Sequence, residues 1–314
     1  MTFDGKIQNT NRQQESSAIL IAPAAATTRN PCFTIKTQRL HSHAQIQLKP
    51  SECADRLMTN DFETRLASLD TTLFQYVLSQ MPEDDQRSLL ALQVALRARH
   101  RPFVYLEIGS YQGGSLQSFV VDSCCQKIIS LDPRLNEYRD VRGRHPYPEN
   151  TTARMLDSLG KIPGADVRKI QSIEAGTDTI KPEAIQPTPH LCLIDGEHTN
   201  EATLRDARFC LSVVDPNGCI LFHDAHLIFT ALDVFIKELD QSGRSFRPYV
   251  LPETIFVIDL GAANYGDTEP VRSRRAVNYK AYLGSLTRND WYRYAYNLPV
   301  YRFLRKIRRL FPRF

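Results

Sequence analysis

Short hydrophobic runs alternate along this chain with stretches in which hydrophobic residues recur every three or four positions. The short runs are rich in β-branched and aromatic residues, a composition that predicts buried strands. They lie at residues 103–108, 127–132, 167–171, 191–195 and 219–224. The stretches with helical spacing lie at about 115–125, 151–159, 200–214 and 231–239. This alternation of strand and helix predicts an α/β fold built around a mostly parallel sheet.

Two further hydrophobic runs, at 249–251 and 255–260, are separated by only a few residues around Pro252. So short a link suits an antiparallel pair, because parallel strands need a long crossover connection. The sequence therefore predicts a Rossmann-like sheet of seven strands, mostly parallel, in which the last strand is antiparallel.

The segment before the first strand predicts two helices. From Asn60, which with Glu63 fits a capping box, hydrophobic residues up to Leu78 fall on one helical face. A second helix opens at Pro82, with acids in its first turn and basic residues in its last turn, which suits the helix dipole. It ends before Pro102. We therefore expect a helical N-terminal addition to the sheet.

These patterns divide the chain into three parts. Residues 1–58 are rich in Gln, Asn, Thr and Ser without periodicity, which predicts a flexible extension. Residues 59–262 form the α/β domain, in which the polar stretch 134–149 predicts a loop. Residues 263–314 form a C-terminal extension, which ends in a basic amphipathic tail at 300–314. That tail predicts either a helix lying on an anionic membrane or a terminal helix packed on the core.

Composition narrows the class of protein. The chain has 314 residues, 24% of them charged, and a net charge of only +4, with no long basic face in the core. We therefore expect no nucleic-acid partner. Seven scattered cysteines without a C-x-x-C pair predict a reducing compartment and no zinc cluster. We expect a cytoplasmic protein, peripheral on the inner face of a membrane if the tail binds lipid. The sequence indicates no oligomeric state.

Four of the predicted parallel strands end in an acid, and parallel strands bring these acids to one edge of the sheet. The acids are Glu107, Asp132, Asp195 and Asp224. A single acid after a strand is often only a helix cap. Here, however, a glycine turn from Gly109 to Gly114 follows the first strand, and such a turn lets a ligand approach the backbone and the next helix. The edge therefore predicts a nucleotide-type pocket.

The ordered set of motifs resembles the class I S-adenosylmethionine-dependent methyltransferases, and most closely the macrolide and sugar O-methyltransferase-like subfamily, the methyltransferase family 24 type. The resemblance covers about 103–260. The residues that carry it are Glu107-Ile108-Gly109-x-x-x-Gly113-Gly114-Ser115, then Asp132, then Asp195-Gly196-Glu197-His198, and finally His223-Asp224-Ala225.

The resemblance implies a binding site for the cofactor S-adenosyl-L-methionine. Gly109 and Gly113 would let the backbone approach the methionine portion, Asp132 would accept both ribose hydroxyls, and Ser172 would border the adenine. The alternative for Asp132 is a turn or cap residue before the following proline. The same resemblance places further residues in the cofactor pocket, namely Glu107, Ser110, Ser115 and Asp195.

Asp195 and Asp224 predict a metal site with Mg²⁺ as its ion, because hard oxygen ligands suit that ion. The resemblance extends here to catechol O-methyltransferase, although Ala225 stands where that enzyme has an amide ligand. His223 or His226 is the alternative ligand, and imidazole favours softer metals. A second alternative is that Asp224 caps a helix and the histidines are ordinary loop residues.

His198 is the predicted general base, acting together with Asp195. It lies three residues beyond Asp195, at the offset where the base of catechol O-methyltransferase stands. An unperturbed histidine titrates near neutral pH and can take a proton from a reacting group. Glu197 is the rival base. A loop histidine with no chemical role is the other alternative.

We therefore expect a methyltransferase that acts on a hydroxyl of a sugar or small metabolite, so that a small molecule or glycan is the acceptor. One alternative is a catalytically silent cofactor-binding or scaffold protein. Another is an N-methyltransferase on the same fold, although D-G-E-H after the fourth strand favours oxygen nucleophiles over the aromatic-proline motif of many amine methyltransferases. A nicotinamide oxidoreductase fits poorly, because Tyr111 interrupts the G-x-G-x-x-G fingerprint.

Overall fold

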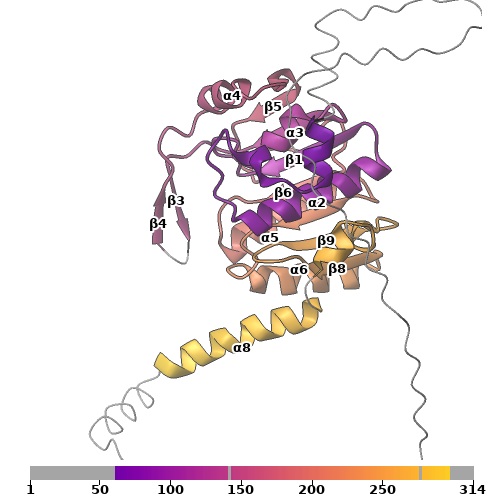
Figure 1. Ribbon diagram of the computed structural model, residues 1–314. Helices are drawn as coiled ribbons and strands as arrows, with labels where there is room; N and C mark the ends of the chain where they lie inside the picture. Colours follow the sequence, from indigo (N-terminus) through magenta and orange to yellow (C-terminus); the bar gives the residue numbers. More distant parts are fainter. Residues whose placement is uncertain (1–60, 141–142, 276–277, 298–314) are drawn as a thin grey trace, which may run out of the picture. The chain divides into compact units, whose positions relative to one another are not determined.

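The computed structural model of the protein describes residues 61–140, 143–275 and 278–297 (Figure 1). The predictions made for 1–58 and for the tail at 300–314 lie outside the described residues. Within them, a seven-stranded sheet runs in the order β5-β2-β1-β6-β7-β9-β8, and a separate two-stranded sheet pairs β3 with β4.

The seven-stranded sheet confirms the predicted α/β class. β1, β2, β5, β6 and β7 are parallel to one another, while β9 is antiparallel to both β7 and β8. The strands are β1 (Phe103–Ile108), β2 (Cys125–Leu131), β5 (Ile170–Ile173), β6 (Leu191–Ile194), β7 (Cys219–Phe222), β8 (Phe246–Val250) and β9 (Phe256–Leu260). The strand order reverses between β1 and β6, so the carboxyl ends of these two strands border the crevice where ligands of open α/β sheets lie.

Helices cover both faces of this sheet, because successive strand residues point to opposite sides. In β1, Tyr105 belongs to the hydrophobic cluster under one helical layer and Leu106 to the cluster under the other. The first layer contains α2 (Glu83–Arg99), α3 (Gln117–Val121) and α4 (Thr152–Gly160). The second contains α5 (Asn200–Val213), α6 (Phe229–Gln241) and the first turns of α8 (Tyr279–Asn297).

The prediction of one long helix before α2 is wrong. A helix occupies residues 61–67 and is followed by a 3-10 turn, η1 (Thr71–Phe74). Leu69 has a φ of 55°, which a continuing right-handed helix cannot accommodate. Asp70 then caps η1 by accepting a hydrogen bond from the Thr72 amide. Leu78, expected on the buried helical face, is 85% exposed.

The stretch predicted as a loop at 134–149 contains a β-hairpin instead, made of β3 (Glu137–Asp140) and β4 (Gly143–Pro146). Packing between tyrosine rings supports this hairpin. The Tyr147 ring lies edge-on to Tyr138 and to Tyr111, with ring centroids 5.2 and 5.0 Å apart. The polar and proline-rich composition of the stretch conceals this arrangement, because Tyr111 comes from another part of the chain.

Several smaller boundaries also differ from the predictions. The third parallel strand starts at Ile170, because Asp166 caps a 3-10 turn, η2 (Val167–Lys169), where the strand was expected to begin. The helix after the glycine turn is shorter than expected. Three more short elements complete the described part, namely η3 (Pro182–Ala184), η4 (Tyr265–Asp267) and α7 (Val271–Arg274).

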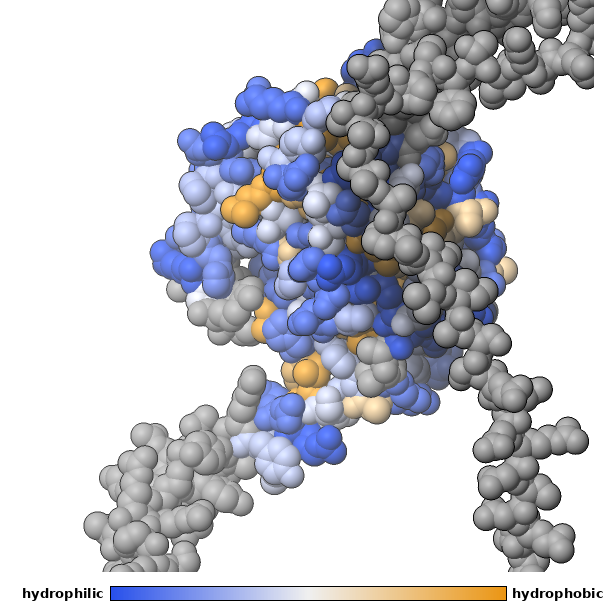
Figure 2. All heavy atoms as spheres, in the orientation of Figure 1, coloured by the Kyte–Doolittle hydropathy of each residue, from blue (hydrophilic) through white to orange (hydrophobic). Residues whose placement is uncertain are grey.

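The packed domain extends beyond residue 262. Ala263, Tyr265 and Val271 are buried in the first hydrophobic cluster, and the Arg274 guanidinium donates to the Asp84 carbonyl oxygen of α2 at 3.0 Å. On the face shown in Figure 2, the described surface is mostly hydrophilic with scattered hydrophobic side chains. Over the described residues, none of the helices combines the length and the hydrophobicity that crossing a membrane requires.

Candidate functional site

A narrow cleft lies at the carboxyl edge of the sheet, where the strand order reverses. We call it the edge cleft. Its lining residues are Gln80, Gly109, Tyr111, Asp132, Tyr138, Tyr147, Asn150, Asp195, Gly196 and His198. An adjoining hollow is bordered by residues 78–81 and by Gly114 and Ser115 of the glycine turn. The edge cleft therefore brings together predicted cofactor, metal and base residues from separate strands.

The glycine turn is shaped by the close approach of β1 and β6. Gly109 has a φ of +90°, and a Cβ there would lie 2.2 Å from the Asp195 carbonyl oxygen. Gly113 has a φ of +83°, and its Cβ would lie 2.8 Å from the Leu159 side chain. Only glycine combines this backbone conformation with this space. The turn consequently exposes its backbone to the edge cleft.

Glu107 lies under this turn rather than in the edge cleft. Its side chain is fully buried and accepts hydrogen bonds from the Tyr105 and Ser115 hydroxyls. Burial raises the pKa of Glu107 to about 8, although the two hydroxyls favour the charged form. The Glu107 side chain thus holds Ser115 in place through this hydrogen bond. Because Glu107 does not line the edge cleft, its contact with a cofactor stays a prediction.

Asp132 borders the edge cleft, but protein donors occupy both of its oxygens. Oδ2 accepts from the Tyr111 amide at 2.9 Å, and Oδ1 accepts from the Arg134 amide at 2.7 Å. The Tyr138 hydroxyl and the Asn150 amide also donate to Oδ1, at 3.2 and 3.4 Å. Asp132 is therefore a turn residue, as the alternative expected, and also a wall of the edge cleft. A ribose would have to replace the long contacts.

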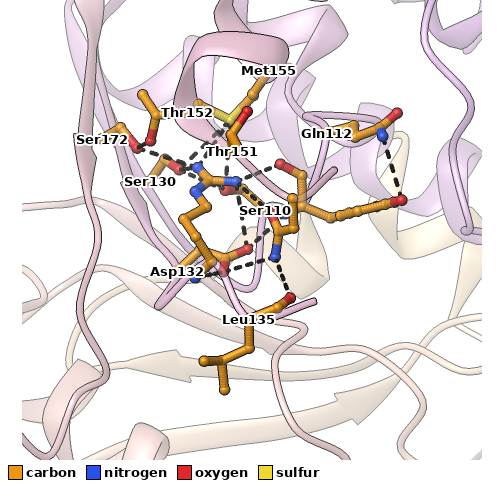
Figure 3. Close-up of polar contacts among 12 residues, drawn as sticks. Ser110, Gln112, Ser130, Asp132, Leu135, Thr151, Thr152, Met155 and Ser172 are labelled. Atoms are coloured by element: carbon orange, nitrogen blue, oxygen red, sulfur yellow. Dashed lines mark hydrogen bonds and ion pairs between the residues drawn. The ribbon is translucent and has the colours of Figure 1, made fainter. Parts of the chain in front are cut away.

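Arg134 is a buried cation that the sequence did not single out, because it lies in the stretch predicted as a loop. Its guanidinium is 3.6 Å from the Asp132 carboxylate and also donates to the Tyr111 carbonyl oxygen. Figure 3 shows the side chains of Ser110, Ser130, Met155 and Ser172 gathered close to one another. The other partners of Arg134 are the hydroxyls of Ser110, Ser130 and Ser172, the Met155 sulfur and the Asn150 amide oxygen. Asp132 and Arg134 together bind both polar groups of the Tyr111 backbone, because Asp132 accepts from its N–H and Arg134 donates to its carbonyl oxygen. We call this pair of contacts the clamp on Tyr111.

This cluster also places Ser110 and Ser172. The Ser110 hydroxyl lies 2.5 Å from that of Ser130, and the Ser172 hydroxyl lies 2.7 Å from that of Thr152. Neither serine lines the edge cleft. Their predicted contacts with a cofactor therefore stay predictions, while their observed partners tie β1, β2 and β5 to α4.

A buried chain of acids and histidine stands behind the other wall of the edge cleft. The His223 Nδ1 atom lies 2.8 Å from Asp195, and its Nε2 atom lies 3.2 Å from Asp85 of α2. Asp85 also accepts hydrogen bonds from the backbone and hydroxyl of Thr254. Burial favours the neutral imidazole, but the Asp195 and Asp85 carboxylates raise the pKa of His223 well above its usual value. A doubly protonated His223 therefore fits between the two acids.

His198 stands at the front of this chain. Its Nε2 atom lies 3.4 Å from Asp195 and 3.5 Å from Asp224, which brings together three of the predicted residues. Burial favours the neutral form of Asp195, but His223 and His198 lower the pKa of that carboxyl below its usual value. His198 lies between two carboxylates, those of Asp195 and Asp224.

The alternatives for the neighbouring residues can be judged from their positions. Asp224 has a φ of 50°, and α6 begins five residues later at Phe229, with Ile228 as an N-cap that makes no side-chain hydrogen bond. The structure therefore does not support the alternative in which Asp224 caps this helix. His226 is the more exposed histidine, 3.9 Å from Asp224. Glu197, the rival base, accepts a hydrogen bond from the Thr199 hydroxyl.

A divalent cation fits the donor chemistry of this wall. Ligand atoms of Asp195, His198 and His223 lie within 4.8 Å of one another. Asp224 faces the same imidazole as Asp195, so the two predicted ligands share a neighbourhood. A set with two imidazoles suits softer ions than Mg²⁺, which prefers oxygen ligands. The His223 contacts with Asp85 and Asp195 also make that imidazole a poor ligand while it is protonated.

A larger hollow of about 550 Å³ lies away from this edge, between residues 61–76 and the segment that follows α4. Two of its polar side chains, Asp61 and Gln117, already have partners. Asp61 pairs with Arg65, and the Gln117 amide bonds to backbone atoms of residues 74–77 and Gly114. The edge cleft, with its converging acids and histidine, is therefore the better candidate for chemistry.

Sequence reasoning missed Asp85, Arg134 and Tyr138 as members of the site. Asp85 was interpreted only as an acid in the first turn of a helix, and the other two lay in a presumed loop. No local pattern marks them, because each acquires its role from a partner outside its own element. The only sequence signal near them was the set of acids at the strand ends, which indicated where the site lies but not these three residues.

Residues 106–225 match the sequence profile of a family described as a methyltransferase domain. No curated protein matches the chain. Among solved structures, the S-adenosylhomocysteine-bound methyltransferase PaMTH1 of Podospora anserina is 16% identical, with a TM-score of 0.44, and the match covers 70% of this chain and 100% of that one.

Two more solved structures are similar to the chain. The O-methyltransferase NovP is 11% identical with a TM-score of 0.48, over 66% of this chain and 99% of that one. The calicheamicin methyltransferase CalS11 is 14% identical with a TM-score of 0.44, over 73% of this chain and 100% of that one.

Proposed function

We propose that this chain is an S-adenosylmethionine-dependent methyltransferase that methylates a hydroxyl group of a sugar or another small metabolite, a proposal supported by the match of residues 106–225 to a methyltransferase domain family. The observation that supports this most is the position of His198. Its imidazole lines the same cleft as the glycine turn and Asp132, and it stands between Asp195 and Asp224.

The edge cleft would hold the cofactor across the carboxyl ends of β1, β2 and β6. The glycine turn allows close approach, and the clamp on Tyr111 keeps that turn in one conformation. Asp132 would accept ribose hydroxyls in place of the Tyr138 and Asn150 contacts. The bound cofactor supplies a methyl group activated on a sulfonium sulfur. Holding that group in line with the acceptor oxygen would provide much of the rate.

The chain's own contribution to the chemistry would be removal of a proton. A neutral hydroxyl is a weak nucleophile, and its oxygen attacks the methyl carbon more readily as the proton leaves. His198 Nε2 would accept this proton, and the carboxylates of Asp195 and Asp224 would stabilise the resulting imidazolium. His223 keeps Asp195 charged and oriented through its 2.8 Å contact. The acceptor oxygen would then gain the methyl group while the sulfur keeps the bonding electron pair.

A divalent ion is a separate part of the proposal. The carboxylates of Asp195 and Asp224 would hold it, and it would stabilise negative charge on the acceptor oxygen. Chelation should lower turnover, and Mg²⁺ or a softer divalent ion should restore it. The affinity for S-adenosylhomocysteine should remain unchanged, because the cofactor's proposed contacts lie with the glycine turn and Asp132. Full turnover in chelator, in both the wild type and Asp224→Ala, would remove the metal from the account.

Two alternatives remain distinct outcomes. A silent cofactor-binding protein would bind S-adenosylhomocysteine and form no methylated product. An N-methyltransferase would form a product whose new methyl group lies on nitrogen. A base at His198 favours oxygen as the nucleophile, because a neutral hydroxyl is a weak nucleophile until its proton is removed, whereas a neutral amine is nucleophilic without that help.

The decisive variant is His198→Ala. Loss of a general base should lower turnover about a hundredfold or more, and the remaining rate should no longer rise through neutral pH. Binding of S-adenosylhomocysteine, measured by calorimetry, should stay as in the wild type. His100→Gln is the matched control, because this histidine precedes β1 at the opposite edge of the sheet and contacts Tyr265. Unchanged turnover in His198→Ala would exclude this base and leave Glu197 as the candidate.

A further inference from the structure

The last described helix, α8, is buried only at its beginning. The Tyr279 ring lies edge-on to Phe256, and Leu283 is buried in the second hydrophobic cluster. From Thr287 to Asp290 every residue is exposed. Trp291, Tyr292 and Tyr294 follow with exposed fractions of 59, 57 and 67%. They are three of the six large hydrophobic side chains that are exposed in the described part of the chain.

Charge is concentrated in the same segment. Residues 288–314, which we call the basic segment, contain eight of the chain's 39 lysines and arginines but one of its 35 acids. The basic segment therefore carries a net charge of +7, and the rest of the chain carries −3. Its hydrophobic residues recur at helical spacing between the basic ones. They are Val300, Phe303, Leu304, Ile307, Leu310 and Phe311.

We propose that the basic segment binds the surface of an anionic membrane and holds the methyltransferase domain there. Tryptophan and tyrosine favour the boundary between lipid and water, because each ring joins a hydrophobic body to a polar group. Lysine and arginine are attracted to anionic headgroups, and hydrophobic residues at helical spacing can lie among the acyl chains. The exposed aromatic residues of α8 and the basic residues beyond them thus suit one and the same surface.

Other partners fit these features less well. Two copies of the basic segment would repel each other, because each carries +7. Nucleic acid would attract the charge, but it would leave the regularly spaced hydrophobic residues of 300–311 without a partner. A lipid surface satisfies the charged and hydrophobic residues together.

The sequence offers a direct probe, because Trp291 is the only tryptophan in the 314 residues. With the full-length protein, its fluorescence emission should shift to shorter wavelength when phosphatidylcholine vesicles containing phosphatidylserine are added. Pure phosphatidylcholine vesicles should shift it much less. Raising the salt concentration should reverse much of the shift, because salt screens the charge attraction. Brominated lipids should quench the emission if the ring enters the interface.

Variants separate the two contributions. Neutralising Arg305, Lys306, Arg308 and Arg309 to Gln should weaken vesicle binding about fivefold for each charge removed, the equivalent of about 1 kcal/mol. Arg244→Gln, an exposed arginine of the domain, should bind as the wild type. Tyr292→Ala with Tyr294→Ala should weaken binding, whereas Tyr76→Ala, also an exposed tyrosine, should not.

Three outcomes would overturn the proposal. The first is an emission spectrum that ignores anionic vesicles at low salt. The second is a shift that depends on protein concentration alone, which would assign α8 to a second copy of the chain. The third is a shift with an oligonucleotide but not with vesicles, which would assign the charge to nucleic acid. None of these outcomes bears on methyl transfer, which is measured separately.

Discussion

Each acid at the carboxyl edge of the sheet has a different set of partners, and these partners determine what the acid can do. Glu107 meets only hydroxyls in a dry interior, and burial raises its pKa to about 8. Asp195 meets two imidazoles, which lower its pKa despite burial. Burial thus favours the neutral form of the first acid, which holds the turn in place, while the two imidazoles favour the charged form of the second, which can orient a base.

Glu107→Gln tests the neutral state of this buried acid. Because the folded-state pKa of about 8 lies above the ordinary 4.5, the folded protein binds the extra proton between these values and loses stability as pH rises through that window. As pH rises through this window, the wild-type free energy of unfolding should fall relative to that of Glu107→Gln. The fall should be about 1.4 kcal/mol for each unit by which the folded-state pKa exceeds the unfolded-state pKa.

Chemical denaturation at the two ends of this window measures the difference. Any contribution of His223 to the pH dependence is the same in both proteins, so it cancels in the difference between their free energies of unfolding. Glu201→Gln, an exposed acid at the start of α5, should show no such relative change. A wild-type protein that gains stability over Glu107→Gln as pH rises would show that Glu107 is charged when folded.

The contact between Tyr138 and Asp132 makes a second prediction at this scale. The tyrosine hydroxyl occupies Oδ1 of the acid expected to accept the ribose. Tyr138→Phe should therefore bind S-adenosylhomocysteine a few-fold more tightly, as expected from losing one competing hydrogen bond of about 1 kcal/mol. Asp132→Ala should bind it more weakly, and Tyr76→Phe should not differ from wild type. Calorimetry that finds weaker binding in Tyr138→Phe would make the hydroxyl a cofactor contact instead.

The sequence indicated the positions of single residues where a residue type and a strand end coincide, while the roles of these residues stay predictions. Asp132, Asp195 and His198 follow buried strands, and the structure brings all three to the edge cleft. Asp85 and Arg134 could not be found in this way. Asp85 reaches His223 from a helix more than a hundred residues earlier, and Arg134 turns inward only because its φ of 57° redirects the chain.

At the scale of elements, the site depends on two turns meeting across the sheet. β1 and β6 end side by side, and the turn at Gly109 passes so close to Asp195 that a side chain has no room. The β3–β4 hairpin adds Tyr138 and Tyr147 to the wall of the edge cleft. The position of Asp195, and with it that of the proposed base His198, is thus linked to the position of the glycine turn through the backbone.

Gly109→Ala should disrupt both turns together. The added Cβ would overlap the Asp195 carbonyl group, and the φ of +90° strains any side chain. We expect a loss of about 3 kcal/mol in the free energy of unfolding, with loss of cofactor binding. Gly160→Ala is the control, because it lies in α4 and its Cβ would find only one atom, at 3.9 Å. Equal stability of the two variants in chemical denaturation would contradict this view of the turn.

Prediction of elements succeeded for the buried strands, whose hydrophobic runs are short and bounded by turns. It failed where the end of an element is set by one backbone angle or by distant packing. Leu69 ends the first helix through its positive φ, although the hydrophobic periodicity continues to Leu78. The hairpin is ordered through tyrosine rings that include Tyr111, outside the segment itself.

At the scale of the whole molecule, charge is unevenly divided along the chain. The family match covers residues 106–225, and the basic segment begins well beyond it. Removing residues 300–314 should therefore abolish binding to anionic vesicles and leave the affinity for S-adenosylhomocysteine unchanged. Sedimentation with vesicles and calorimetry measure the two properties independently. A truncated protein that lost cofactor affinity would indicate that this tail packs against the domain.

The central claim is methyl transfer to oxygen with His198 as the base, and one measurement addresses it most directly. Full-length protein is incubated with S-adenosylmethionine carrying an isotopically labelled methyl group and with a metabolite extract, and mass spectrometry locates the label. The account predicts labelled methyl on a hydroxyl oxygen with wild-type protein, and little label with His198→Ala that still binds S-adenosylhomocysteine. Label on nitrogen, or equal labelling by the two proteins, would contradict it.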